Sequence, residues 1–364
     1  MIKNFIFVSI FQLSSITGLA TYKSQKNNEL LFDKELITTI NNTIYEDEGY
    51  NPNFKNVSKK LNVLNKNKEK FGMIYFFDDN KGYLLVNNSN EIMQSDYKNG
   101  FDINITDSDF NYIVYKDKKF YDSNNHLLHD RFKNSNNTGG KSFLMGGDFY
   151  WHADSSFTSQ KVRYVLTEWD SYYSTLTNTS GATFGNAITW STDQTGNNCG
   201  PLAIANLLYT YKMNNTIDLT NGAASSLALA NSLESYVLYS TLGFTLPATI
   251  TNVNSFINSS NYEIDYCDVT NGISDTLSIA PLIGFYSDVQ INEAHYVLVT
   301  GKGRSVYMKV FGINFYTSWD IVNTWYDTYD TSDGYICKKY WVDNQYINSG
   351  YVLRNKNNNQ VLGL

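Results

Sequence analysis

Apolar residues in the first part of the chain have the spacing of helices. Val57, Leu61 and Leu64 follow an i, i+4, i+7 pattern, which predicts an amphipathic helix over Val57–Lys70 with its lysines on the polar side. A second helix is predicted earlier, over Asp33–Ile44. After these two helices the pattern changes to short apolar runs.

The short apolar runs are separated by turn residues and predict an antiparallel sheet. The strongest turn signal is Asp78–Gly82, whose aspartates, asparagine and glycine favour a hairpin between two strands. Residues 21–145 are therefore expected to form a small α+β domain. Its strands are predicted at Gly72–Phe77, Gly82–Val86 and Tyr112–Tyr115.

A polar, glycine-rich stretch, Lys133–Gly147, is predicted to be an exposed linker that proteases can reach. Beyond it the chain becomes aromatic and β-rich, and residues 146–364 are expected to form a second domain. Helices are predicted after Cys199 and within Ala223–Leu242. Strands are predicted at Tyr262–Val269, Tyr296–Thr300, Val306–Phe311, Asp320–Trp325 and Tyr335–Tyr340.

Residues 1–20 have the layout of a signal peptide. Lys3 precedes an apolar core, and small residues stand at Gly18 and Ala20, where cleavage is expected. An uncleaved anchor is the alternative, although the apolar stretch is short and polar for a membrane span. No second apolar run of about 18 residues occurs, so we expect a secreted protein with no membrane span after cleavage.

Composition excludes several classes of function. Apolar residues make up 42% of the 364 residues and charged residues 17%, which is enough for a packed core. The net charge of −7 argues against a nucleic-acid partner. Three cysteines argue against a disulfide framework. Neither a CxxC nor an HExxH spacing occurs, so no metal or cofactor is expected. His126 and His129 are assigned to a polar surface turn, with contact to one metal from a helix as the alternative.

Cys199 has the surroundings that cysteine catalysis requires. Pro201 is tolerated only in the first turn of a helix, so Cys199 is predicted at a helix N-terminus, where partial positive charge and free N–H groups favour a thiolate. Gln194, five residues earlier, is the candidate oxyanion donor beside the Cys199 N–H, with a solvated loop residue as the alternative. The apolar stripe of the helix is predicted at Ile204, Leu207, Leu208 and Tyr211.

The partners of Cys199 are expected on the strands that follow. His295 stands at the edge of an apolar strand and is the candidate general base, whereas His152 lies in an aromatic run before the cysteine. Asn323 ends a further strand and is the candidate that orients the imidazole, with Asn314 as its rival.

The order glutamine, cysteine on a helix, histidine on a strand and Asn-x-Trp resembles the papain-like cysteine peptidases. The Asn-Thr-Trp that begins at Asn323 and the Gly-Tyr that begins at Gly334 are similar to motifs of that family. The interval from Cys199 to His295 suits its smaller bacterial members, such as staphopain and streptopain. The chain is most similar to the secreted cysteine peptidases of mycoplasmas that degrade immunoglobulin, and Tyr75–Val86 resembles the hairpin of a streptopain-type prosegment.

This resemblance implies a papain-like α+β fold in which the cysteine-bearing helix packs on an antiparallel sheet or barrel. It implies a catalytic triad of Cys199, His295 and Asn323, assisted by Gln194. It further implies a secreted endopeptidase made as a self-processing zymogen, with residues 21–145 as the prosegment. Its substrates would be extracellular proteins, host immunoglobulin among them, and we expect it to act as a monomer.

The chain departs from the papain pattern in three places. Gln194 is closer to the cysteine, and Gly-Pro follows the cysteine, as in the Cys-Gly motif of bacteriocin-processing peptidases. An additional aromatic stretch, Gly312–Trp319, separates His295 from Asn323.

Two other functions stay open. One is a cysteine amidase that acts on cell-wall peptides, and the other is a non-catalytic adhesin or antibody-binding surface protein on a peptidase scaffold. The remaining cysteines, Cys267 and Cys337, lie on predicted strands and are expected to be small buried structural residues.

Overall fold

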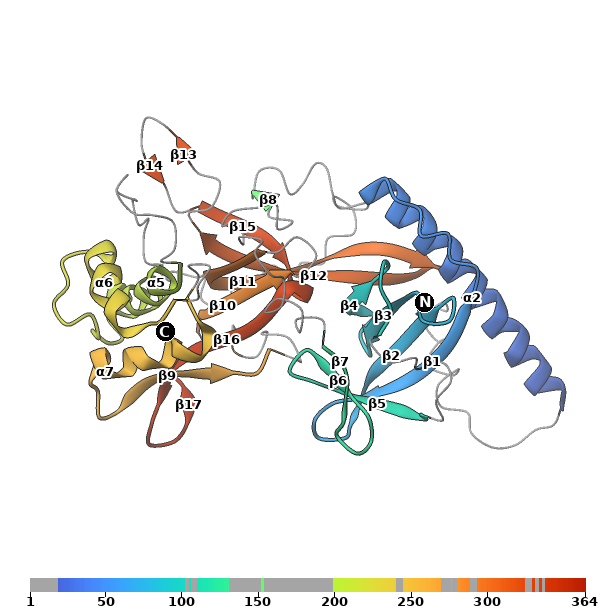
Figure 1. The fold of residues 1–364 in the computed structure, drawn as a ribbon, viewed down its shortest axis with the longest axis horizontal. Coiled ribbons are helices and arrows are strands. Elements are labelled where there is room, and N and C mark those ends of the chain that lie inside the picture. The colour runs from blue at the N-terminus through green and yellow to red at the C-terminus, as the bar shows by residue number, and fades with distance from the viewer. Residues whose placement is uncertain are drawn as a thin grey trace, which may run out of the picture.

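The computed structural model (Figure 1) has a mixed α+β fold, as the sequence predicts at this coarse level. It describes residues 19–101, 105, 110–130, 152–153, 199–239, 245–269, 276, 280–288, 293–324, 329–330, 334–335 and 338–364. The predicted linker, Lys133–Gly147, and nearly all of the predicted signal peptide lie outside these ranges. Within the described part of the chain, no helix is both long and apolar enough to cross a membrane.

The first half consists of one long helix and a curved set of strands. Helix α2 (Leu19–Glu48) contains the predicted helix over residues 33–44, which is therefore confirmed. The strands are β1 (Val57–Leu64), β2 (Lys70–Phe77), β3 (Gly82–Asn87), β4 (Glu91–Asp96), β5 (Tyr112–Lys116), β6 (Lys119–Tyr121) and β7 (Leu127–Asp130).

The helix predicted over Val57–Lys70 is wrong, because this segment begins with strand β1. Leu61 and Val63 are buried on either side of the exposed Asn62, which is the alternation of a strand. The strand pairs antiparallel with β2 and parallel with β5, so its hydrogen bonds come from segments elsewhere in the chain. These long-range partners decide between two conformations that the spacing of three apolar residues does not separate.

The predicted hairpin between β2 and β3 is confirmed. Asp78, Asp79 and Asn80 all have positive φ angles, a conformation that aspartate and asparagine tolerate better than most residues. The Asp78 carboxylate also accepts hydrogen bonds from the backbone N–H groups of Lys55 and Asn56, which fixes the turn against the start of β1.

The second half places short helices beside the other part of the sheet. Helix α5 (Cys199–Met213) begins at the candidate nucleophile, and α6 (Ser226–Leu233) ends earlier than the predicted helix over Ala223–Leu242. The remaining elements are the 3-10 helices η3 (Glu234–Tyr236), η4 (Pro247–Val253) and η5 (Asn344–Tyr346), helix α7 (Asn254–Ile257), and strands β8 (His152–Ala153), β9 (Tyr262–Cys267), β10 (Leu282–Asp288), β11 (Glu293–Val310), β12 (Ile313–Thr324), β13 (Tyr329–Asp330), β14 (Gly334–Tyr335), β15 (Lys338–Asp343), β16 (Ile347–Asn355) and β17 (Gln360–Val361).

Strands β11 and β12 form one long hairpin that reaches from the second half to the first (Figure 1). The two separate strands predicted at 296–300 and 306–311 are in fact parts of β11, except that Phe311 belongs to the turn that follows. Residues 320–324 of the strand predicted at 320–325 form the last part of the longer β12, and residue 325 lies outside the described residues. The hairpin turns at Phe311 and Gly312, both with positive φ angles.

A single sheet joins both halves within the described residues. Its path is β17-β16-β10-β11-β12-β4-β3-β2-β1-β5-β6-β7, with β15 on β12 and β9 on β16. The link between the halves is a short parallel pairing of β12 with β4. The end of the hairpin that carries His295 and Asn323 lies in the second half, and we call it the inner end. The end with the turn at Phe311 and Gly312 lies against the first half, and we call it the outer end.

Candidate active site

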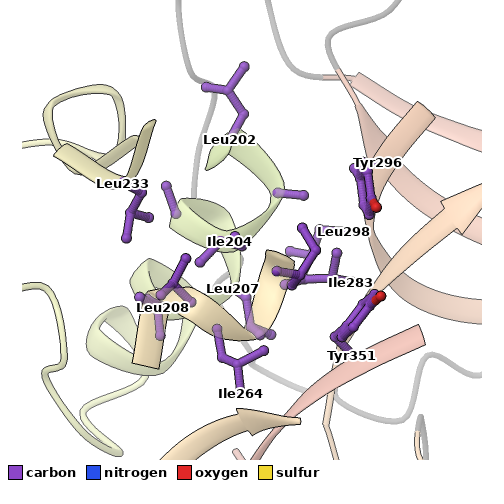
Figure 2. Close-up of a cluster of buried hydrophobic side chains, with 14 of the residues drawn as sticks. Leu202, Ile204, Leu207, Leu208, Leu233, Ile264, Ile283, Tyr296, Leu298 and Tyr351 are labelled. Carbon is purple, nitrogen blue, oxygen red and sulfur yellow. The ribbon is translucent and has the colours of Figure 1, made fainter. Parts of the chain in front are cut away.

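Helix α5 is held by an apolar face that the sequence predicts correctly. Its predicted stripe is buried, and Pro201 lies in the first turn of the helix. Figure 2 shows α5 beside the strands, where its leucines share one cluster with Ile283 of β10, Leu298 of β11 and Tyr351 of β16. Most residues of α5 are completely buried, so the start of the helix is fixed in the interior of the second half.

Cys199 opens this helix, and its thiol is almost completely buried, with an exposed fraction of 1%. Burial raises the pKa of the thiol to about 11, whereas nearby backbone N–H groups of Tyr296, Gly200, Cys199 and Thr245 oppose this rise. The sulfur thus has four backbone N–H groups near it, which favour an anion, at a position where water does not stabilise one. A thiolate here at neutral pH requires a cation beside it.

His295 is brought to this helix through its neighbour in the chain. The structure describes the backbone of His295 on β11, where it pairs with Tyr286 of β10. The next residue, Tyr296, is buried in the same cluster as Cys199, and its backbone N–H is one of the groups near the thiol. The backbone of the candidate base therefore passes beside the candidate nucleophile.

The two asparagine candidates lie at opposite ends of β12. Asn323 pairs with Leu298, three residues after His295, so its backbone is at the inner end of the hairpin near the candidate base. Asn314 pairs with Lys309 at the outer end, and its side-chain amide donates a hydrogen bond of 3.3 Å to the hydroxyl of Tyr316. Nine residues of extended chain separate the two positions by about 30 Å.

Thr245 is a neighbour of the thiol that no sequence pattern indicates. Its backbone N–H is near the Cys199 sulfur, and a Cβ atom added to Gly200 would lie 2.6 Å from its Oγ1. The hydroxyl is completely buried and has no hydrogen-bond partner among the described residues. Because Gly200 has no Cβ atom, the Thr245 side chain can pack against the first turn of α5.

Other residues singled out from the sequence fall into two groups. Cys267 is a buried free thiol on β9, as predicted for a structural cysteine. His152 is described only as a backbone position on β8, paired with Trp341. Gln194, Trp325 and Cys337 lie outside the described residues.

The assignment of both His126 and His129 to a surface turn is only half right. The His126 ring lies 2.9 Å from the Asp122 carboxylate in an exposed turn. His129 lies on β7 and is buried, stacked on Phe101 with ring centroids 4.5 Å apart. Within the described residues, no group of three histidine, cysteine or acidic side chains could hold a metal ion.

Comparisons with family models, with curated proteins and with solved structures found no match to this chain. The candidate site is therefore interpreted from its own geometry and from the motifs in the sequence.

Proposed function

We propose that the protein is a papain-like cysteine endopeptidase with Cys199 as its nucleophile and His295 as its base. The observation that supports this most is the position of the Cys199 thiol, at a helix start and beside the backbone N–H of Tyr296, the residue that follows His295. Support for the proposal is therefore the backbone N–H of Tyr296, which belongs to a segment far from Cys199 in the sequence and lies near its thiol at a helix N-terminus, where an anion is favoured.

The proposed reaction follows from the chemistry of these groups. An imidazolium at His295 offsets the effect of burial and holds Cys199 as a thiolate. The sulfur attacks the peptide carbonyl carbon, and the N–H groups around Cys199 stabilise the oxyanion together with Gln194. His295 protonates the leaving amine as the C–N bond breaks, and then accepts a proton from the water that hydrolyses the thioester.

Asn323 is the proposed third member, because its backbone lies at the same end of the hairpin as His295. Its amide would fix the tautomer and the orientation of the imidazole. Asn314, at the other end of β12, is too far away to serve this role.

The biological setting of the proposal rests on the resemblance to secreted peptidases. We propose that the chain is exported, cuts itself in the predicted linker, Lys133–Gly147, and acts on extracellular proteins, host immunoglobulin among them. The small residue at position 200 and the buried hydroxyl of Thr245 would then border the point where the scissile bond is bound.

The test is incubation of the purified chain with a reductant and a panel of substrates that includes casein, immunoglobulin and cell-wall peptides. We expect protein cleavage by the wild type and by Cys267→Ala, and none by Cys199→Ala. Digestion by Cys199→Ala would disprove the assignment of the nucleophile. Release of cell-wall peptides without protein cleavage would favour an amidase, and binding of immunoglobulin without turnover would favour a non-catalytic surface protein.

A further inference from the structure

The outer end of the β11–β12 hairpin is buried in the hydrophobic core of the first half. Met308, Val310 and Phe315 are each at most 3% exposed. They share one buried cluster with Leu36 and Ile40 of α2 and with residues of β2, β3 and β4. We call this cluster the hairpin core. Figure 1 shows the hairpin extending beneath α2 and beside β4.

Backbone pairing continues across the same contact. Tyr316 and Thr317 of β12 pair in parallel with Glu91 and Ile92 of β4. The backbone N–H of Tyr316 also donates a 2.9 Å hydrogen bond to the carbonyl of Asn90. The hairpin therefore completes both the sheet and the core of the first half, and its removal would expose a sheet edge and an apolar surface.

A buried lysine forms a second contact between the halves, at Asn344 of η5. Lys118 lies in the turn between β5 and β6, has a positive φ angle, and is completely buried. Its Nζ atom is 3.4 Å from both the backbone and the side-chain oxygen of Asn344. Lysine is rarely buried without specific partners, so the contact of this turn with the second half is a specific one.

Asn344 connects this lysine to a buried carboxylate between β10 and β12. Its amide donates 2.9 Å hydrogen bonds to both oxygens of Asp320, which also accepts a 2.6 Å hydrogen bond from the hydroxyl of Tyr286. All three side chains are buried. Tyr286 is the register partner of His295, and Asp320 is three residues before Asn323. The network is thus built on the strands that carry the candidate site.

Two further contacts join the halves, an exposed ion pair and a half-buried hydrogen bond. Lys66, in the loop after β1, forms a 2.5 Å ion pair with Asp268 of the second half. Ser95 of β4 donates a 3.2 Å hydrogen bond to the side-chain oxygen of Gln345. The ion pair is exposed and contributes little stability, and the hydrogen bond is a single neutral one with a small net contribution. The hairpin core and the Lys118 network are therefore the main contacts between the halves.

We propose that the first half, residues 19–130, is a permanent subunit that stays bound through the outer end of the hairpin after the chain is cut in the linker. The partner of the hairpin surface is thus the amino-terminal fragment of the same molecule. Separation would expose the hairpin core and leave the Asp320 network without Lys118. A cut between residues 130 and 152 gives a two-chain protein, and this holds whether or not the protein cleaves itself.

The experiment uses the full chain with the recognition site of a specific external protease placed within residues 133–147. Because the cut is made by another enzyme, the result is independent of the proposed peptidase activity. We expect both fragments to elute together from a size-exclusion column in native buffer and to give the mass of their sum in native mass spectrometry. Separate elution of the fragments would overturn the proposal.

Two phenylalanines of the same hairpin provide a matched pair for the surface. Phe315→Asp places a charge in the hairpin core, and we expect its cut fragments to separate at least about a hundredfold more readily than those of the wild type. Phe311→Asp changes an exposed residue at the turn and should leave the complex intact. Each variant is folded as an intact chain before it is cut, and Phe315→Ala serves if Phe315→Asp does not fold. A Phe315 variant as tightly associated as wild type would disprove the role of this surface.

Two adjacent lysines test the buried network. Lys118→Met keeps a long apolar side chain without the charge, and we expect the apparent dissociation constant of its cut fragments to rise about tenfold. Lys119→Met removes the same charge from a residue that pairs with Asp130 inside the first half, at 2.8 Å, and should not change association. Equal behaviour of the two variants would remove Lys118 from the proposal.

Discussion

Cys199 and Cys267 are both buried free thiols in the second half of the molecule, and burial raises the pKa of each. The pKa of Cys199 rises to about 11 and that of Cys267 to about 12. Burial therefore does not distinguish a candidate nucleophile from a structural cysteine. The difference lies in the groups around the sulfur.

Backbone N–H groups surround Cys199, whereas Cys267 has side-chain neighbours. Four N–H groups lower the pKa of Cys199: those of Cys199 and Gly200 at the helix start, that of Thr245, and that of Tyr296, which follows His295 in the chain. At Cys267, Arg354 and Thr276 lower the pKa while Asp268 raises it. A fixed set of N–H donors can stabilise first the thiolate and then the oxyanion that forms during the reaction. A structural thiol packed within a sheet does not need such donors. Four predictions test this contrast.

The largest effect is expected from deletion of the two sulfurs. Cys199→Ala should lower kcat for protein hydrolysis by about ten-thousandfold, because the nucleophile is lost. Cys267→Ala should retain most of the wild-type kcat. The measurement is cleavage of a fluorescent casein under reducing conditions, and comparable losses in both variants would erase the distinction between the thiols.

The second prediction concerns the cation that Cys199 needs. In wild type, alkylation of Cys199 by iodoacetamide should already be fast at neutral pH. In His295→Ala the midpoint of the pH profile should move upward, because burial, which raises the pKa of the thiol, then acts without an opposing imidazolium. At pH 7 the rate should fall about 10- to 100-fold, since the more basic thiolate is also more nucleophilic.

Cys267 is the internal reference for this experiment. Mass spectrometry of peptides reports both cysteines in one sample, and the slow labelling of Cys267 should be the same in wild type and His295→Ala. A Cys199 profile that does not move would remove His295 as the base.

The third prediction compares a glycine beside each thiol. A Cβ at Gly200 would lie 2.6 Å from Thr245 Oγ1, and a Cβ at Gly350 would lie 2.8 Å from the sulfur of Cys267. Gly200→Ala and Gly350→Ala should each lower the free energy of unfolding by about 1–3 kcal/mol through overpacking. Urea unfolding measures this loss, and only Gly200→Ala should also lower kcat. A reduced kcat in Gly350→Ala at a temperature where it is folded would contradict the contrast.

The smallest effect is the structural contribution of Cys267. Cys267→Ala removes one buried sulfur and should lower the free energy of unfolding by about 1 kcal/mol. The loss should not depend on pH below about 8, where the thiol is protonated in both folded and unfolded chains. At higher pH the loss should shrink, because the raised pKa of the folded wild type makes its own stability decrease as the unfolded thiol ionises.

The local sequence predicts an element correctly where all the residues that determine it lie within one segment. Pro201 and the apolar stripe after it predict where α5 begins and which face it buries. The aspartates and asparagine before Gly82 predict the β2–β3 hairpin, because few other residues tolerate its backbone angles. The candidate nucleophile was found in the same way, because the four consecutive residues Asn198–Pro201 predict a helix start.

Tertiary structure decided everything that depends on a distant partner. Val57–Leu64 is a strand because β2 and β5 supply its hydrogen bonds, and three apolar residues at helical spacing do not outweigh that pairing. Two short strands were predicted where the structure has one long strand, β11. The outer end of β11 is buried against the first half, and no local sequence pattern predicts this contact. Thr245 likewise lies beside the thiol through contacts outside its own segment, and it pairs with Tyr239 in an isolated antiparallel bridge.

The sequence by itself thus determined that Cys199 begins a helix, and it proposed His295 and an asparagine as partners. Only the tertiary structure placed the residue after His295 against the thiol and set Asn323 and Asn314 at opposite ends of one strand. Helix starts and tight turns depend on backbone angles of a few neighbouring residues. The assembly of a site depends on strand register and on burial shared between segments far apart in the chain, and these are properties of the whole fold.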